Sequence, residues 1–437
     1  MTTLRLWLCW GVLSLVMAGF FTYRLRTEDS TVFLPGKTTH GHYQIEMSCE
    51  SCHTPFGGVR EQACLDCHAE ELKTANDSHP KKKFTDPRNA ERVAHLDARQ
   101  CVACHVEHRP DMTNAIGVTL PQDYCFHCHA GVGGERPSHR GMEFNTCASA
   151  GCHNFHDNRA LYEDFLVAHN GEPEIRDLPV VVSRMPPPPL GPPLTMAHLD
   201  APSDAAVTPA LRDDWVSTAH AEAGVNCTGC HEVATESGAK QWTDHPAHEV
   251  CASCHKPESA GFLAGKHGMR LAAGLSAMSP ALARLPMEPE AHSRQLGCGS
   301  CHVPHQFNTR HAAVDACLEC HADTHSQSYK ASSHFALWQS EAEGRAASGS
   351  GVSCATCHLP RETSEAGGDR TVRVQHNQNW NLRPNEKMIR DVCLSCHGLA
   401  FSIDALADRA LIEANFRGRP SRHIESIDMA ARRVSKH

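Results

Sequence analysis

The stretch CVACHVEH at residues 101–108 contains the pattern that decides the fold: two cysteines three positions apart, with a histidine directly after the second. The chain has 23 cysteines, and all of them except Cys9 form close pairs of this kind, eleven in total. In the eleventh pair, four residues separate Cys147 from Cys152, and His153 follows. The other ten pairs have the spacing C-x-x-C-H: Cys49/Cys52/His53, Cys64/Cys67/His68, Cys101/Cys104/His105, Cys125/Cys128/His129, Cys227/Cys230/His231, Cys251/Cys254/His255, Cys298/Cys301/His302, Cys317/Cys320/His321, Cys354/Cys357/His358 and Cys393/Cys396/His397.

This pattern is typical of covalent haem attachment. Two thiols add to the two vinyl groups of one haem, and the adjacent imidazole binds the iron as proximal ligand. The two extra residues between Cys147 and Cys152 can bulge outwards while both sulfurs reach the same ring edge. The sequence therefore predicts eleven covalently bound haems c, with the histidine of each motif as the proximal ligand.

Structural zinc and disulfides are the alternative interpretations of paired cysteines. Zinc sites accept C-x-x-C pairs, and oxidising compartments favour disulfides, but neither requires a His after every second Cys. With 33 histidines among 437 residues, eleven such coincidences would have a probability on the order of 10⁻¹². The pattern therefore favours haem.

The composition is that of a chain whose interior is filled by cofactors. Aromatic residues make up 6% of it and the mean hydropathy is −0.41, so large apolar side chains are scarce. We expect the haem-free chain to be largely unfolded. The formal net charge is −9, and ferric haems with ionised propionates bring it to about −20. This charge disfavours nucleic acid and favours redox partners with basic docking surfaces.

An apolar segment near the N-terminus predicts a membrane helix. Residues 6–23, LWLCWGVLSLVMAGFFTY, carry no charge and follow Arg5. The length of this segment is at the short end of the range for a membrane span. No clear small-x-small cleavage site follows, so an uncleaved anchor over residues 1–28 is favoured over a cleaved signal. Haem attachment outside the cytoplasm places the chain on the periplasmic side of the bacterial inner membrane. Cys9 is then a plain apolar residue.

The motifs fall into two groups. Five lie between residues 49 and 153 and six between 227 and 397, and the stretch between them includes SRMPPPPLGPPL, which favours an extended polyproline conformation. We expect a pentahaem module over 29–170, a Pro-rich linker over 171–213 and a hexahaem module over 214–437. The alternative is that the linker is an ordered strap on one module. The expected fold is mainly α-helical with much irregular structure, packed around haem.

Helical segments are expected at 87–98, 161–169, 329–343 and 402–416, the last of them packed on the final haem, and no strand pattern is visible.

The number of histidines bears on the second axial ligand of each iron. Beyond the eleven proximal residues, 22 of the 33 histidines remain, so two imidazoles per iron are available throughout. A six-coordinate iron has no open position for substrate, which suits electron transfer. The candidate distal ligands are His42, His79, His95, His108, His139, His156, His220, His245, His267, His292, His305, His334 and His376; His127 and His311 are weaker candidates.

Two family resemblances add to this prediction. Residues 40–170, with the C-x-x-C-H-x-x-H unit at Cys101–His108, resemble the class III cytochromes of the c3 and c7 type. Residues 215–415 are similar to the hydroxylamine oxidoreductase-like multihaem family, on the stretches WVSTAHAEAGVNCTGCH at 215–231, GKHG at 265–268, CLECHADTHSQSYKASSHFALW at 317–338, GVSCATCH at 351–358, QHNQNWNLRP at 375–384 and VCLSCHGL at 392–399.

The second resemblance implies closely stacked haem pairs and, in some members, oxidation of hydroxylamine or reduction of nitrogen or sulfur oxyanions. This chain departs from the catalytic members, because it has six motifs in that half rather than eight, no tyrosine after Tyr329 and no C-x-x-C-K motif. The resemblance therefore supports the predicted haem arrangement better than it supports the family's enzymatic activity.

We expect an electron carrier that links a quinol-oxidising membrane complex to other cytochromes, with a homo-oligomer as an open alternative to a monomer. The first alternative function is a multihaem oxidoreductase in which one haem of the second module lacks a distal ligand and binds a small nitrogen or sulfur compound. The second is a structural or charge-storage role.

Overall fold

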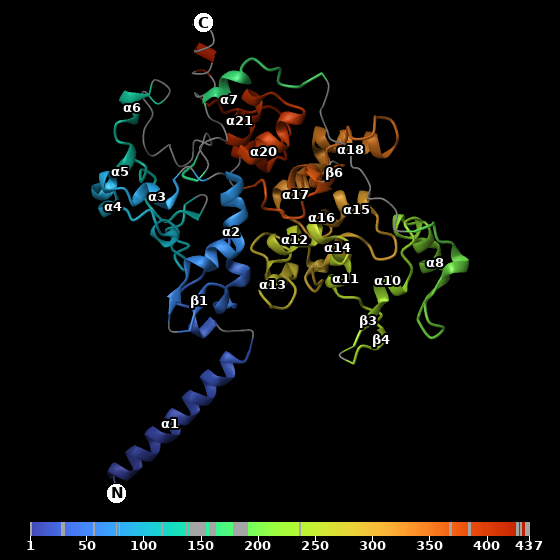
Figure 1. Cartoon of the computed structure of the whole chain (residues 1–437), viewed down its shortest axis with the longest axis horizontal. Coiled ribbons are helices and arrows are strands. Elements are labelled where there is room, and N and C mark those ends of the chain that lie inside the picture. The colour runs from blue at the N-terminus through green and yellow to red at the C-terminus, as the bar shows by residue number, and fades with distance from the viewer. Residues whose placement is uncertain are drawn as a thin grey trace. The chain divides into compact units, whose positions relative to one another are not determined.

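The computed structural model describes residues 2–27, 31–55, 57–75, 77, 79–114, 117–136, 139, 154–156, 163–177, 191–235, 237–366, 369–382, 386–424, 428 and 431–432 (Figure 1). The motif Cys147/Cys152/His153 and the prolines at 186–189 lie outside these residues. The chain divides into two compact units: unit 1 comprises residues 1–135, 139–149 and 270–276, and unit 2 comprises residues 136–138, 150–269 and 277–437.

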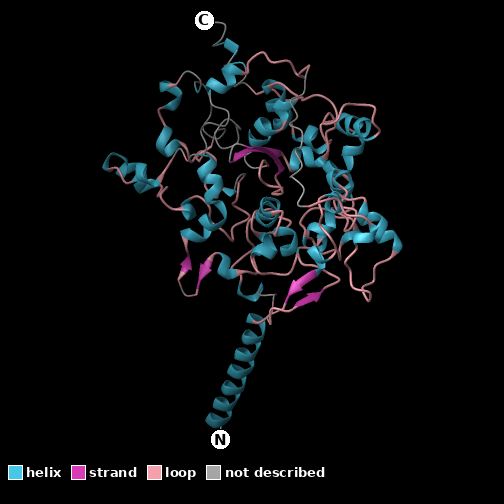
Figure 2. Ribbon diagram, turned by 45° about the vertical axis from the view of Figure 1, so that its right-hand side comes forward, coloured by secondary structure: helices cyan, strands magenta, loops and turns pink. Residues whose placement is uncertain are grey.

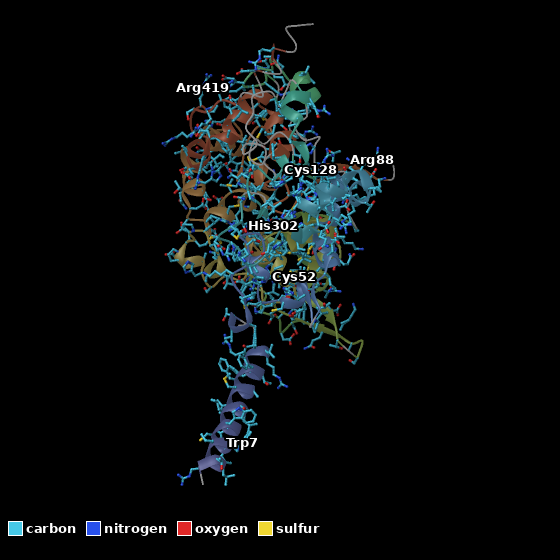
Figure 3. All side chains as sticks on the ribbon, turned by 90° about the vertical axis from the view of Figure 1, so that its left-hand side faces the viewer. Trp7, Cys52, Arg88, Cys128, His302 and Arg419 are labelled. Atoms are coloured by element: carbon cyan, nitrogen blue, oxygen red, sulfur yellow. The ribbon has the colours of Figure 1, made fainter. Side chains whose placement is uncertain are left out.

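The predicted N-terminal helix is present. Helix α1 extends over Thr2–Leu25, and its segment Thr3–Leu25, with a mean hydropathy of 1.7, is long and apolar enough to cross a membrane. None of that segment is buried within the protein, and Trp7 projects from it with 69% of its surface exposed (Figure 3). An apolar helix without a protein partner matches either a membrane anchor or a signal sequence.

Unit 1 consists of short helices joined by irregular segments. Besides α1 it contains a small hairpin and five helices: β1 (His53–Thr54) with β2 (Gly58–Val59), α2 (Glu61–Ala75), α3 (Lys81–Phe84), α4 (Ala90–His95), α5 (Phe126–His129) and α6 (Val132–Glu135). A segment from the second half of the sequence completes the unit. There the buried Arg270 donates hydrogen bonds to the Gln44 carbonyl and to Ser276. Helix α13 (Met269–Ala272) carries this arginine.

Unit 2 contains more helices, which are also short. They are α7 (Glu163–Ala168), α8 (Pro209–Val216), α9 (Ala219–Glu222), α10 (Thr228–His231), α11 (His248–Ala252), α12 (Lys256–Ala264), α14 (Cys298–Cys301), α15 (Thr309–Ala313), α16 (Asp315–Leu318), α17 (Thr324–Ser328), α18 (Ser333–Ala342), α19 (Cys354–His358), α20 (Glu386–Asp391), α21 (Leu399–Ala407) and α22 (Arg409–Glu413). Mainly helical structure with many irregular segments was predicted and is confirmed (Figure 2).

The four predicted helical segments correspond to shorter elements. The first contains a 3₁₀ turn at Pro87–Asn89 and α4, and the second contains α7, with residues 161 and 162 outside the described part. The third contains Tyr329–Ala331 and α18, and the last spans α21 and α22. Side chains cap the N-termini of α18 and α22, where Ser332 accepts from Phe335 N–H and Asp408 accepts from Leu411 N–H.

The expectation that no strand would form was wrong. Three antiparallel hairpins are present: β1 with β2, β3 (Glu232–Ala234) with β4 (Lys240–Trp242), and β5 (Arg361–Ala366) with β6 (Asp369–Val374) (Figure 2). The third was visible in the sequence, because a Gly-Gly pair separates two runs of equal length and such a pair favours a two-residue hairpin turn.

Unit 2 has a small apolar core at its C-terminal end. Leu166 of α7, Ile389 of α20, and Leu399 and Ile403 of α21 form a buried cluster. The cluster is small for a unit of this length, which agrees with the scarcity of large apolar residues.

Residues assigned to the linker pack at both ends of its described part. The Ile175 backbone pairs with His397, and Arg176 N–H donates to the Cys396 carbonyl at 2.8 Å. At the other end, Gly191 and Leu194 donate backbone hydrogen bonds to Ala223 and Ala221. Residues 171–177 therefore lie on the final motif. The stretch that begins at residue 191 lies on the segment before the Cys227 motif.

Asp408 begins α22, and its carboxylate has three hydrogen-bond donors. It accepts from Leu411 N–H at 3.1 Å and from the Ser421 N–H and hydroxyl at 2.7 Å each. Hydrogen bonds from the Ser421 side chain and backbone, and from Leu411, lower the pKa of Asp408 to about 2. We predict that Asp408→Ala speeds amide hydrogen exchange in α22 by roughly three- to tenfold, the usual effect of losing an N-cap.

The effect of Asp408 depends on pH with a definite sign. The folded-state pKa of Asp408 lies below the ordinary value of 3.8. The carboxylate therefore stabilises the fold fully above pH 3.8, and its contribution decreases as the pH falls toward 2. The difference between wild type and Asp408→Ala should therefore shrink over this range. Asp408→Asn retains a capping oxygen and should keep most of the protection at neutral pH; equal loss in both variants would contradict the capping role.

Candidate haem-binding sites

Most of the described motifs fold as a helical turn; at Cys49 a 3₁₀ turn over Cys49–Ser51 leads into His53 of β1 instead. The histidine N–H donates to the carbonyl of the first cysteine, at 2.8–3.0 Å, in the motifs that begin at Cys101, Cys125, Cys227, Cys251, Cys298, Cys317 and Cys393. The Cys64 and Cys354 motifs lie within α2 and α19. Positions i, i+3 and i+4 share one face of a helix, so the two thiols and the imidazole point the same way. Cys52, Cys128 and His302 are labelled in Figure 3.

The zinc and disulfide alternatives find no support among the described residues. The 21 cysteines of this part of the chain are free thiols. Within the same residues, no group of three or more His, Cys, Asp or Glu side chains is arranged to hold an ion.

Three motif cysteines are more exposed than the others. Cys254 is exposed, as are Cys49 and Cys67, whereas the other described motif cysteines are half-buried. Cys254 lies just beyond the end of α11, between Ser253 and His255, which are exposed as well. A thioether bond joins the sulfur to the rim of a haem, and a rim can face solvent while the iron is enclosed. Haem attachment through Cys254 stays a prediction, as it does for the other motif cysteines.

Nine of the ten described motif histidines face a second histidine. Each site is named here by the first cysteine of its motif. The pairs, with ring centroids 5.7–6.4 Å apart, are His53/His108 at Cys49, His68/His42 at Cys64, His129/His79 at Cys125, His231/His305 at Cys227, His255/His220 at Cys251, His302/His376 at Cys298, His321/His267 at Cys317, His358/His325 at Cys354 and His397/His334 at Cys393.

This separation fits an iron between two imidazoles. Metal-to-imidazole bonds of about 2 Å, with the ligating nitrogen about 1.1 Å from the ring centre, place two axial rings about 6 Å apart. Direct van der Waals stacking would bring the ring centres closer, as it does for His397 and Phe401 at 4.9 Å. The residues present therefore fit a haem iron with two histidine ligands.

Backbone carbonyls orient several of these rings. The Nδ1 atoms of His105 and His231 contact the carbonyls of Gly117 and Thr243 at 2.9 and 2.7 Å. Gly117 has a φ of +76°, a conformation that favours glycine. His108, His325, His376 and His397 make the same contact with the carbonyls of Gly36, Ile412, Val374 and Glu174. A ring that donates from Nδ1 presents Nε2 as the free ligand atom.

Two facing histidines have a strained backbone. His108 and His305 adopt φ values of +61° and +67°, which cost energy for a residue other than glycine. Both follow a motif histidine by three residues. The left-handed conformation directs each ring away from its own motif toward another, His108 toward His53 and His305 toward His231.

Burial keeps key imidazoles neutral. Desolvation lowers the pKa of His267 and of His358 to about 4, and it also lowers the pKa of His129, His220, His305 and His334. A neutral imidazole has the lone pair that a metal requires, so these rings are in the ligating protonation state at physiological pH.

The His42 ring differs from these, because its Nδ1 meets a carboxylate. Glu107 Oε1 lies 2.6 Å away, and the Glu107 carboxylate also accepts from the Thr39 N–H and hydroxyl at 2.8 Å each. Burial raises the pKa of Glu107, but the hydrogen bonds from His42 and Thr39 outweigh it and lower the pKa to about 2. Glu107 is therefore ionised at physiological pH.

Nine of the predicted distal candidates face a motif histidine or another histidine. Eight of the nine face a motif histidine. The ninth, His95, faces His127 instead, and the two rings lie parallel, 6.2 Å apart. His245 and His292 are exposed, and within the described residues neither faces another histidine. His156 contacts Phe155, and the His139 carbonyl lies near Gly133; their ligand roles stay predictions.

His325 was missed at the sequence level. It faces His358 at 6.1 Å, its Nδ1 contacts the Ile412 carbonyl at 2.5 Å, and Asn415 Nδ2 donates to its carbonyl. The signal was a histidine four residues after His321, one residue beyond the spacing used to select His108 and His305.

Successive motifs lie next to each other within each unit. The thiol of Cys101 lies close enough to Cys64 to affect its pKa, and the same holds for Cys251 with Cys298 and for Cys317 with Cys354. Other successive motifs are also close enough for one thiol to raise the pKa of another. These are Cys52 with the Cys64 motif, Cys230 with the Cys251 motif, Cys301 with the Cys317 motif and Cys357 with the Cys393 motif. Unit 1 thus contains the series Cys49–Cys64–Cys101, and unit 2 contains a series of six motifs in sequence order.

The first module can now be compared with known families. Residues 41–130 match the family model of cytochrome c3. The match covers the motifs from Cys49 to Cys125 and supports a multihaem c-type cytochrome region, with covalently bound haem and a role in electron transfer. No curated protein matches the chain. The similarity of residues 215–415 to the hydroxylamine oxidoreductase-like family stays a prediction.

We predict that His325→Ala converts one low-spin ferric haem to high spin, because the variant loses the ring that faces His358. Electron paramagnetic resonance (EPR) of the oxidised protein measures this change. His245→Ala is the matched control, since this exposed histidine faces no other ring in the described chain, and its spectrum should equal that of wild type. An unchanged spectrum for His325→Ala would contradict the ligand assignment.

Proposed function

We propose that this chain is a membrane-anchored, periplasmic cytochrome with eleven haems c that transfers electrons between a quinol-linked membrane partner and a downstream redox partner. The nine facing histidine pairs carry this proposal. Bound haem iron supplies a reversible one-electron couple, and two imidazole ligands suit both oxidation states. The cytochrome c3 match over residues 41–130 supports electron transfer independently.

The side chains act by holding and spacing the sites. The two cysteines of each motif would hold one edge of a haem and the motif histidine would bind its iron; at the nine paired sites a histidine from another segment would supply the second ligand. Thiols of neighbouring motifs affect one another's pKa, which supports short distances between successive sites in each unit. The series of six in unit 2 therefore suits stepwise electron transfer along the sequence order.

The oxidoreductase alternative is less well supported. It places a substrate-binding iron without a distal ligand in the second module. All six motif histidines from His231 to His397 face another histidine. An axial position occupied by imidazole does not accept hydroxylamine or nitrite without losing that ligand.

The proposal predicts a holoprotein whose mass exceeds that of the polypeptide by eleven haem groups. Its ferric EPR spectrum should be low-spin at the nine paired sites, and cyanide should not change the spectrum. His325→Ala serves as positive control for cyanide binding, because it opens one axial position. A cyanide-sensitive haem in wild type with turnover of hydroxylamine would favour the oxidoreductase instead.

Helix α1 is proposed as the anchor. We predict that the full chain stays in the membrane fraction after a high-salt wash, because apolar burial rather than charge holds it. Replacing residues 2–25 by a cleavable signal sequence should release a haem-loaded protein to the soluble periplasm. Recovery of the wild-type chain in the soluble fraction would contradict the anchor and favour a cleaved signal.

A further inference from the structure

The Cys64 site differs from its neighbours in what its two axial rings contact. His42 Nδ1 lies 2.6 Å from Glu107 Oε1, and His68 Nδ1 lies 3.1 Å from Glu71 Oε2. Within the described chain, no other facing pair has a carboxylate hydrogen-bonded to both rings. The rings nearest in sequence contact neutral carbonyls instead: His108 of the Cys49 site contacts Gly36, and His105 of the Cys101 site contacts Gly117.

A carboxylate acceptor changes the ligand as well as its orientation. An imidazole that donates from Nδ1 to a carboxylate gains anionic character and becomes a more basic ligand. A more basic ligand stabilises ferric over ferrous iron, and the nearby negative charge acts in the same direction. Two such rings on one iron add their effects. A carbonyl acceptor orients the ring without bringing a formal charge.

We propose that Glu107 and Glu71 are positioning residues that make the Cys64 site lower in reduction potential than the Cys49 and Cys101 sites on either side of it. The inference rests on the proposed function, because it requires His42 and His68 to be iron ligands. The middle site of the series Cys49–Cys64–Cys101 then forms an uphill step, and electrons reside on the outer two sites.

The local structure holds Glu107 in place. The Thr39 N–H and hydroxyl each donate to its carboxylate at 2.8 Å, so the carboxylate is fixed before it meets His42. Glu107 is also adjacent in sequence to His108, which faces His53. Since Cys52 lies within electrostatic range of Glu107, the charge also affects the Cys49 site, but only through space.

The test is a redox titration of the holoprotein monitored by EPR. Glu107→Gln keeps the side-chain size and an acceptor oxygen but removes the charge. It should move the midpoint of the Cys64 site to a more positive potential, with a smaller shift at the Cys49 site and none at the Cys101 site. The signal of the Cys64 site is identified as the one that changes in His42→Met, which replaces an axial ligand.

Two further variants make the test decisive. Glu71→Gln should shift the same midpoint in the same direction without touching the Thr39 contacts, so it serves if Glu107→Gln fails to fold. Glu91→Gln, which removes an exposed charge on α4 of the same unit, is the matched control and should leave the Cys64 midpoint unchanged. The double variant Glu71→Gln/Glu107→Gln should shift it further than either single change.

The outcomes separate this inference from the proposed function. If low-spin signals are present but neither Glu107→Gln nor Glu71→Gln moves the Cys64 midpoint, or if Glu91→Gln moves it equally, the carboxylate effect is wrong while the cytochrome stands. An equal shift at the Cys49 and Cys64 sites also overturns the inference, because charge alone would then explain it. Absence of low-spin haem in wild type would overturn the proposed function itself.

Discussion

The fold depends on one local constraint, the helical turn that the described C-x-x-C-H motifs form, with the Cys49 motif as an exception. The hydrogen bond from the histidine N–H to the carbonyl of the first cysteine closes the turn, and the spacing i, i+3, i+4 directs two thiols and one imidazole to one side. Each turn therefore offers half of a binding site. The other half must come from elsewhere in the chain, so the segments between motifs are arranged to deliver a second imidazole.

This requirement explains why the helices are short and the apolar core is small. A segment that must bring a histidine to a neighbouring motif cannot continue as a long amphipathic helix. The conflict is visible at His108 and His305, where a non-glycine residue adopts a positive φ and the energetic cost is accepted to direct a ring. The apolar cluster of Leu166, Ile389, Leu399 and Ile403 is formed by α7, α20 and α21, which carry no motif residue.

The sequence predicted one half of each site well and the other half incompletely. The cysteines and motif histidines follow from a strictly local pattern, so composition and spacing were sufficient to select them, although spacing did not reveal that Cys254 lies at the surface. The distal partners are long-range contacts: His376 faces His302, and His42 faces His68. Candidates could be named because 22 histidines remained for eleven positions, but the pairing depends on how the loops return, which spacing alone does not determine. His325 and the β5–β6 hairpin were missed for a different reason. Each had a local signal in the sequence, but that signal was weaker than that of the motifs.

The two C-x-x-C-H-x-x-H segments show how one short stretch serves several sites. After Cys104 and His105 come Glu107, which contacts His42 of the Cys64 site, and His108, which faces His53 of the Cys49 site. After Cys301 and His302 come His305, which faces His231 of the Cys227 site, and Phe307, whose ring lies 4.3 Å from that of His220 of the Cys251 site.

In both units the segment therefore reaches its own site and the two sites that precede it. Loss of one such segment would perturb three successive sites together, so the order of motifs in the sequence and their order in space are maintained by the same contacts.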